Sequence, residues 1–121
     1  MMELPRSLFV YRDAWNTLDS QEIRPLLEES LDPNCLFVDP AHVCNGIGEI
    51  ESMIREFRAG FPTSTYELAS GIDGHNRRYR YRWTARLDNS TTVDGMDVTT
   101  VTTSGLIERI DGFFGDFAPM S

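Results

Sequence analysis

Residues 78–87 (RYRYRWTARL) alternate without interruption between two kinds of side chain. One face carries arginine and threonine, and the other carries Tyr79, Tyr81, Trp83, Ala85 and Leu87. Successive side chains of a β-strand point to opposite faces, so this pattern predicts a strand with one buried face. The strand belongs to a sheet-forming half of the chain that begins near Thr65.

The residues that follow continue the sheet. Residues 88–90 (DNS) are typical of a hairpin turn, and residues 93–103 are rich in threonine and valine, as strands are. A turn at residues 104–105 then leads into a last strand over residues 106–117, in which Gly112 and Gly115 indicate bulges. These segments predict a long antiparallel meander.

The residues before the sheet have helical spacing. Leu8, Tyr11, Trp15 and Leu18 recur at intervals of three and four, which predicts one helix, with Ser7 as its cap. A second short helix over residues 23–31 follows a capping box of Asp19 with Glu22, and residues 32–34 end it. A short strand over residues 35–39 and a longer helix over residues 47–61 complete this half.

Helices followed by an antiparallel sheet define an α+β fold. We therefore expect one domain over residues 1–121, in which three N-terminal helices pack on a curved antiparallel sheet. The two layers form a cone that the helices close, with an apolar interior suited to a small hydrophobic molecule.

The composition excludes several classes of function. The net charge of −8 disfavours nucleic acid and anionic membrane as partners, and all eleven basic residues are arginine. Without lysine there is neither a Schiff-base amine nor a phosphate-binding loop, and no dinucleotide fingerprint is present, so no cofactor is expected. His42, Cys44 and Cys35 are too few for a structural metal site. The first residues lack a signal-peptide layout, which favours a cytoplasmic protein without membrane spans.

Three polar residues are candidates for chemistry. Asp39 ends an apolar strand, where desolvation would make it a better base, although it could simply start the turn into Pro40. Asp97 lies inside a predicted strand, where it could be a protonated hydrogen-bond donor or the ion-pair partner of Arg82. Tyr11 lies on the apolar helix face and could be a core residue or a donor in the cavity.

Several segments resemble the ketosteroid isomerases. They are residues 37–40 (FVDP), Asn45-Gly46, residues 54–57 (IREF), and the run from Asp97 through Gly105 to residues 114–116 (FGD). The order of elements is similar to that of nuclear-transport-factor-2-like and SnoaL-like domains over nearly the whole chain. The resemblance implies the cone fold and a homodimer through the outer sheet face.

The resemblance also implies roles for individual residues. Asp39 would be the general base that moves a proton α to a carbonyl, and Tyr11 and protonated Asp97 would donate hydrogen bonds to the enolate oxygen. The implied ligand-binding residues are Trp15, Phe57, Arg58, Trp83 and Phe114. Arg58 replaces a tyrosine that those enzymes often carry, which would favour an acidic substrate. Asp39 is also further from Tyr11 than in the steroid isomerases.

Three functions follow as hypotheses. The first is a ketosteroid-isomerase-like or polyketide-cyclase-like enzyme that transfers protons on a small hydrophobic carbonyl compound. The second is a non-catalytic ligand-binding or dimerisation module, which a cone filled by Trp15, Phe57, Tyr81 and Trp83 would favour. The third is epoxide hydrolysis like that of the limonene-epoxide enzymes, with Arg82, Asp97 and Asp116 activating water.

Overall fold

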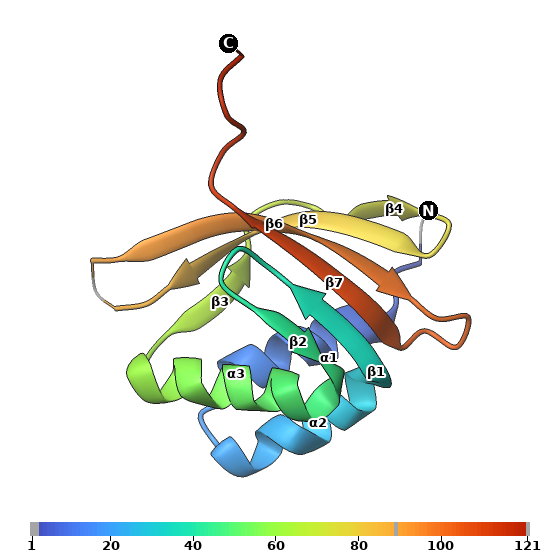
Figure 1. Cartoon of the computed structure of the whole chain (residues 1–121), viewed down its shortest axis with the longest axis horizontal. Helices are drawn as coiled ribbons and strands as arrows, with labels where there is room; N and C mark the ends of the chain where they lie inside the picture. Colours follow the sequence, from blue (N-terminus) through green and yellow to red (C-terminus); the bar gives the residue numbers. More distant parts are fainter. Residues whose placement is uncertain (1–2, 89, 121) are drawn as a thin grey trace.

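The computed structural model describes residues 3–88 and 90–120, and its helices lie on one side of a curved sheet (Figure 1). The helical segments are α1 (Arg6–Asn16), the 3-10 turn η1 (Ser20–Glu22), α2 (Ile23–Ser30) and α3 (Gly46–Gly60). The strands are β1 (Leu31–Val38), β2 (Val43–Asn45), β3 (Thr65–Leu68), β4 (Asp73–His75), β5 (Arg78–Arg86), β6 (Thr92–Val101) and β7 (Ile107–Phe114). The expected α+β cone, with three helices on a curved sheet, is confirmed.

Helix α1 starts one residue earlier than its predicted cap. Pro5 holds the N-cap position without a side-chain hydrogen bond. Ser7 lies inside the helix, where its hydroxyl donates to the carbonyl of Gly105 at 2.5 Å, so its prediction as the cap is wrong. The helix ends before Leu18, whose side chain is 87% exposed. The predicted spacing included Leu18 because the spacing of apolar residues alone does not mark where a helix ends.

The segment before α2 has only half of the predicted capping box. Asp19 caps η1 by accepting from the backbone N–H of Gln21. The carboxylate of Glu22 instead accepts from the hydroxyl of Thr17, whose oxygen also accepts the N–H of Asp19. At its other end α2 stops at Ser30, and β1 begins at Leu31, before the predicted stop signal.

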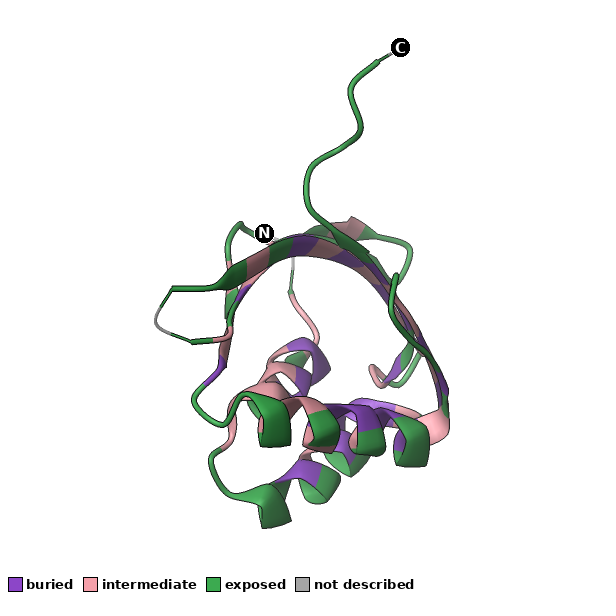
Figure 2. Ribbon diagram, turned by 60° about the vertical axis from the view of Figure 1, so that its left-hand side comes forward, coloured by how far each residue is buried: buried purple, intermediate pink, exposed green. Residues whose placement is uncertain are grey.

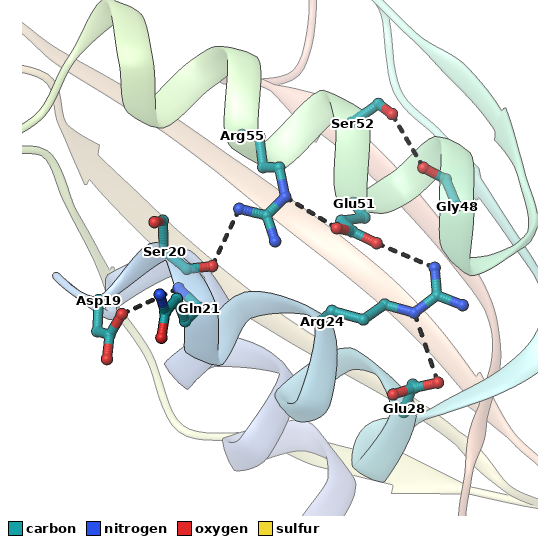
Figure 3. Close-up of polar contacts among 9 residues, drawn as sticks. All are labelled: Asp19, Ser20, Gln21, Arg24, Glu28, Gly48, Glu51, Ser52 and Arg55. Carbon is teal, nitrogen blue, oxygen red and sulfur yellow. Dashed lines mark hydrogen bonds and ion pairs between the residues drawn. The ribbon is translucent and has the colours of Figure 1, made fainter.

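A network of charged side chains joins α2 to α3 (Figure 3). Glu51 on α3 accepts from Arg24 on α2 at 2.9 Å and from Arg55 at 2.8 Å. The two guanidinium groups lower the pKa of the Glu51 carboxyl. Arg55 also donates to the carbonyl of Ser20 at 2.9 Å, so the network fixes the turn before α2 as well.

The sheet has the order β2-β1-β7-β6-β5-β3, with β4 paired to the other end of β5. The pairs β5–β6 and β6–β7 are antiparallel, as predicted. The pair β1–β7 is parallel, so the sheet is mixed and the expectation of a wholly antiparallel sheet is wrong at this one place. Strand β1 comes from the helical half of the chain, and it completes the sheet beside the last strand.

The predicted bulges lie elsewhere in the structure. Gly112 pairs in register with Asp97, and Gly115 follows the end of β7. The register shifts instead between Thr100 and Val101 on β6, and between Leu31 and Leu36 on β1. Asn89 of the predicted hairpin turn lies outside the described residues.

The concave face of the sheet curves around the helices, and buried residues gather between the two layers (Figure 2). Residues that are fully buried there include Ala14, Leu27, Cys35, Ile50, Ile54, Ile107 and Ile110. These residues belong to one packed core, and a second, smaller cluster forms around Tyr81, Trp83 and Ala85 on β5. Among the described residues, no helix is both long and apolar enough to cross a membrane.

Candidate functional site

A cavity of about 280 Å³ lies between the concave face of the sheet and helices α1 and α3. Its walls are mainly aromatic and aliphatic, and the polar groups among them are two carboxyls, two tyrosine hydroxyls, two indole N–H groups and one imidazole. The aromatic residues in the walls are Tyr11, Trp15, Phe37, Phe57, Tyr66, Trp83 and Phe114. The volume suits a small ligand, at the lower end of the usual range for such sites.

Asp97 provides the most buried carboxyl of this cavity. It lies on β6 with 5% of its surface exposed. Its Oδ1 accepts from the indole N–H of Trp83 at 2.9 Å, and its Oδ2 accepts from the hydroxyl of Tyr66 at 3.1 Å. It forms no ion pair with any described residue, and Arg82 lies on the exposed face of β5. The alternative in which Arg82 neutralises Asp97 is therefore wrong.

Burial sets the acidity of Asp97. Loss of solvation raises the pKa of its carboxyl from 3.8 to about 6, against the opposing effect of the hydrogen bonds from Trp83 and Tyr66. The negative charges of Asp39 and Asp111 raise the pKa further. A carboxyl with this pKa is mostly ionised at neutral pH and yet is a far stronger base than a solvated aspartate.

Asp39 and Asp97 both lie beside Gly112. A methyl group on Gly112 would lie 3.0 Å from Oδ1 of Asp97 and 3.3 Å from Cβ of Asp39. The Asp39 Oδ1 accepts from the backbone N–H groups of Ala41 and His42, each at 2.8 Å. Asp39 therefore both shapes the turn after β1 and contributes a carboxyl to the cavity wall.

Tyr11 contributes a hydroxyl from α1 on the opposite wall. Burial raises its pKa well above the usual value, and the charge of Asp97 raises it further, whereas the neighbouring Trp15 indole lowers it. The hydroxyl is thus a neutral donor at physiological pH that lies within the electrostatic reach of Asp97. The structure brings Tyr11, Asp39 and Asp97 to one cavity.

The predicted ligand-binding residues divide into two groups. Trp15, Phe57, Trp83 and Phe114 line the cavity. Arg58 is not among the described residues that line it, because its guanidinium donates to carbonyl oxygens of Ser64, Thr17 and Pro62. These bonds tie the end of α3 to the end of α1, so the expectation that Arg58 binds an acidic ligand is wrong.

Sequence reasoning missed Tyr66. Its ring packs between Trp15 and Trp83, with centroids 6.2 and 5.5 Å away, and its backbone exchanges two hydrogen bonds with the side chain of Asn16. Alternation within residues 65–68 (TYEL) could have placed Tyr66 on one face with Leu68. Its contact with Asp97 depends on the strand order β3-β5-β6, which no local pattern contains.

Comparison with solved structures identifies the family. A SnoaL-like family protein from Agrobacterium tumefaciens, with a proposed isomerase function, superposes with a TM-score of 0.83 and 31% identity over 91% of this chain and 95% of that one. The chain belongs to the SnoaL-like family. No protein-family model and no curated protein matches the sequence.

More distant structures share the SnoaL-like fold. An NTF2-like protein of unknown function from Exiguobacterium has a TM-score of 0.77 at 18% identity, covering 92% of this chain and 99% of its own. A proposed polyketide cyclase from Sinorhizobium meliloti has a TM-score of 0.73 at 16% identity, covering 90% and 94%. At these identities the likeness shows the fold alone.

Proposed function

We propose that this SnoaL-like protein catalyses proton transfer next to the carbonyl group of a small, neutral, apolar compound. The observation that carries the proposal is the environment of Asp97, a buried carboxyl with a pKa of about 6 in an apolar cavity. Burial and neighbouring charge can instead belong to a structural ion pair. Asp97 has no such partner among the described residues, which favours a chemical role.

Asp97 acts as the general base in this proposal. Its carboxylate takes a proton from the carbon next to the carbonyl, and the C–H electron pair forms the C=C bond of an enolate while negative charge moves to oxygen. Tyr11 donates a hydrogen bond to that oxygen. Where the ligand carries a C=C bond next to the carbon that loses its proton, the enolate is a dienolate, and protonated Asp97 then returns the proton to its far carbon, which moves the double bond without any net redox change.

The same enolate also accounts for a cyclase reaction. If the ligand carries a second carbonyl group, the enolate carbon can attack it and close a ring, and the proton held by Asp97 goes to the new alkoxide.

Asp39 has a different role here from the one that the resemblance implied. Two backbone N–H groups already hold its Oδ1, and its charge raises the pKa of Asp97. We therefore assign the proton transfer to Asp97 and the adjustment of its basicity to Asp39.

The third hypothesis, epoxide hydrolysis, has no assembled site. Arg82 lies on the exposed face of β5, and Asp116 is exposed beyond the end of β7. Neither belongs to the described cavity wall that holds Asp97. The cone is also not filled by side chains, and Tyr81 is engaged with Thr99 through their hydroxyls at 3.0 Å.

The proposal can be tested without the natural substrate. The bicyclic ketone 2-tetralone has exchangeable α-protons, so its exchange for deuterium in D₂O can be followed by proton NMR. We expect the protein to accelerate this exchange, and Asp94→Asn, an exposed carboxyl on the same strand, to leave the rate unchanged. No protein-dependent exchange would contradict the proposal.

The pH dependence should separate the two carboxyls. Because Asp97 acts in its ionised form, kcat/KM for exchange should rise with pH through about 6 and then level off. Asp39→Asn keeps an oxygen that can accept from Ala41 and His42 and removes the negative charge, so the midpoint should move to lower pH while the plateau stays within about tenfold. A plateau more than about a hundredfold lower would return the role of base to Asp39.

We also propose that two copies pair through the outer sheet face. Met96 lies between Arg82 and Phe113 in the cross-strand register, and Phe113 is 57% exposed. A two-fold axis would place Met96 and Phe113 of one copy against the same residues of the other. Light scattering should give the mass of a dimer, and Phe113→Glu should give a monomer because it sets like charges against each other. A monomeric wild type would contradict this expectation.

A further inference from the structure

The indole nitrogen of Trp15 is a buried donor without a hydrogen-bond partner in the described part of the chain. Trp15 lines the cavity from α1, one helical turn after Tyr11. Buried N–H groups are paired in the great majority of cases, so an unpaired one in a cavity wall points to an acceptor that arrives from outside. The Trp15 indole lies beside the Tyr11 hydroxyl and lowers its pKa, but the two groups do not meet in hydrogen-bond geometry.

We infer that the indole N–H of Trp15 and the hydroxyl of Tyr11 form a donor pair that binds the oxygen of the ligand. This inference rests on the proposed function and deepens it, because it fixes which end of the cavity receives the carbonyl group. The oxygen lies at α1, and the carbon that loses its proton faces Asp97 on the sheet.

Packing fixes the direction of the Trp15 donor. The indole stacks on Tyr66 with a centroid distance of 6.2 Å and an interplanar angle of 22°. The ring of Phe57 meets it edge to face at 5.4 Å and 76°. A ring held on two sides loses little further freedom when a ligand binds, which favours a preorganised donor.

The second tryptophan cannot take this role. The indole N–H of Trp83 already donates to Asp97 at 2.9 Å. Trp83 and Tyr66 therefore hold the base, whereas Trp15 and Tyr11 remain for the ligand. Of the three neighbouring aromatic residues, Tyr66 and Trp83 thus donate to Asp97, and Trp15 is left to donate to the ligand.

Charge defines the class of ligand. Asp39 and Asp97 are both acidic, and no arginine belongs to the cavity wall in the described ranges 3–88 and 90–120. An anionic ligand would be repelled, and a hydrocarbon would leave the two α1 donors unpaired. The site therefore selects a neutral, largely apolar molecule with a carbonyl or similar acceptor oxygen.

The chain offers a direct spectroscopic test, because Trp15 and Trp83 are its two tryptophans and give separate indole signals. The ¹⁵N-labelled protein would be titrated with 2-tetralone and with tetralin, which has the same rings without the carbonyl. We expect the indole proton of Trp15, assigned with Trp15→Phe, to move downfield with the ketone and not with the hydrocarbon. Equal shifts with both compounds would overturn the inference.

Binding by the variant provides a second readout. Trp15→Phe keeps an aromatic ring beside Tyr66 and removes the N–H, so it should weaken 2-tetralone binding about fivefold and leave tetralin binding unchanged. Phe57→Leu is the matched control, since it alters an apolar wall and should weaken both compounds by the same factor. A Trp15→Phe variant that binds both compounds as the wild type does would also overturn the inference.

The two proposals fail in different ways. If 2-tetralone binds and exchanges its α-protons while the Trp15 signal does not distinguish it from tetralin, the donor pair is wrong and the proposed function stands. If the Trp15 signal responds to the ketone and no exchange is catalysed, the proposed function is wrong and the donor pair stands. If neither compound binds, both proposals fall.

Discussion

Replacing Asp97 by asparagine should lower kcat/KM for α-proton exchange by about a hundredfold to ten-thousandfold. The amide keeps the shape of the side chain and can still accept from Trp83, but it cannot take up a proton from carbon. The measurement is the deuterium exchange of 2-tetralone, with Asp94→Asn as the control on the same strand. A variant that keeps more than a tenth of the wild-type rate would show that Asp97 is not the base.

The same substitution should stabilise the protein at neutral pH. The pKa of Asp97 is about 6 in the folded chain and near 3.8 in the unfolded chain, so between these values the folded state binds more protons. The free energy of unfolding therefore falls as pH rises through this window, and above it the buried charge costs about 3 kcal/mol. Asparagine has no charge to bury and avoids that cost.

Urea denaturation at two pH values measures this effect. At pH 7 Asp97→Asn should gain up to about 3 kcal/mol in the free energy of unfolding, and the gain should disappear below pH 4, where the wild-type carboxyl is protonated. Higher stability with lower activity is typical of a group kept for chemistry at the expense of folding. A gain or loss that does not change with pH would contradict the assignment.

Gly95→Ala should destabilise the sheet at the point where it holds the base. A methyl group on Gly95 would collide with the indole ring of Trp83 and with the backbone carbonyl of Phe113. The carbonyl is held in the sheet and cannot move aside. We expect a loss of about 1–3 kcal/mol or more in the free energy of unfolding. Exchange activity should fall as well, because a displaced Trp83 no longer donates to Asp97.

A matched glycine provides the control for this prediction. A methyl group on Gly71 has no heavy atom within 4 Å, so Gly71→Ala should leave both stability and activity close to wild type. Urea denaturation measures stability, the deuterium exchange of 2-tetralone measures activity, and near-ultraviolet circular dichroism reports the surroundings of the tryptophans. A Gly95→Ala variant with wild-type stability and spectrum would show that the sheet can shift to accept the methyl group.

The sequence predicted elements well where one face is buried along their length. The alternation around Trp83 predicted β5 to within one residue, and the spacing from Ile47 to Phe61 predicted α3. The ends of helices and strands were less predictable, because the groups that cap them can come from distant parts of the sequence. Ser7 is the example, since its hydroxyl bonds to Gly105 at the other end of the chain.

The sequence predicted the two aspartates of the candidate site. It did not predict the side chains that pack against them or donate hydrogen bonds to them. Asp97 is noticeable because aspartate is rare within strands, and Asp39 because it ends an apolar run. Tyr66 carries no such signal, since a tyrosine in a strand is ordinary. Arg58 was misplaced because its carbonyl acceptors on Thr17 and Ser64 come together only in the folded chain.

The parallel pairing of β1 with β7 has a consequence for the order of folding. Of the described strands β7 is the last in the sequence, and yet it lies between β1 and β6. It therefore joins the segment that carries Asp39 to the strand that carries Asp97. A chain still emerging from the ribosome can form its helices and the β5–β6 hairpin, but it cannot join them into one sheet. The cavity must therefore assemble after β7 has been synthesised, and a chain that stops before β7 should lack the site.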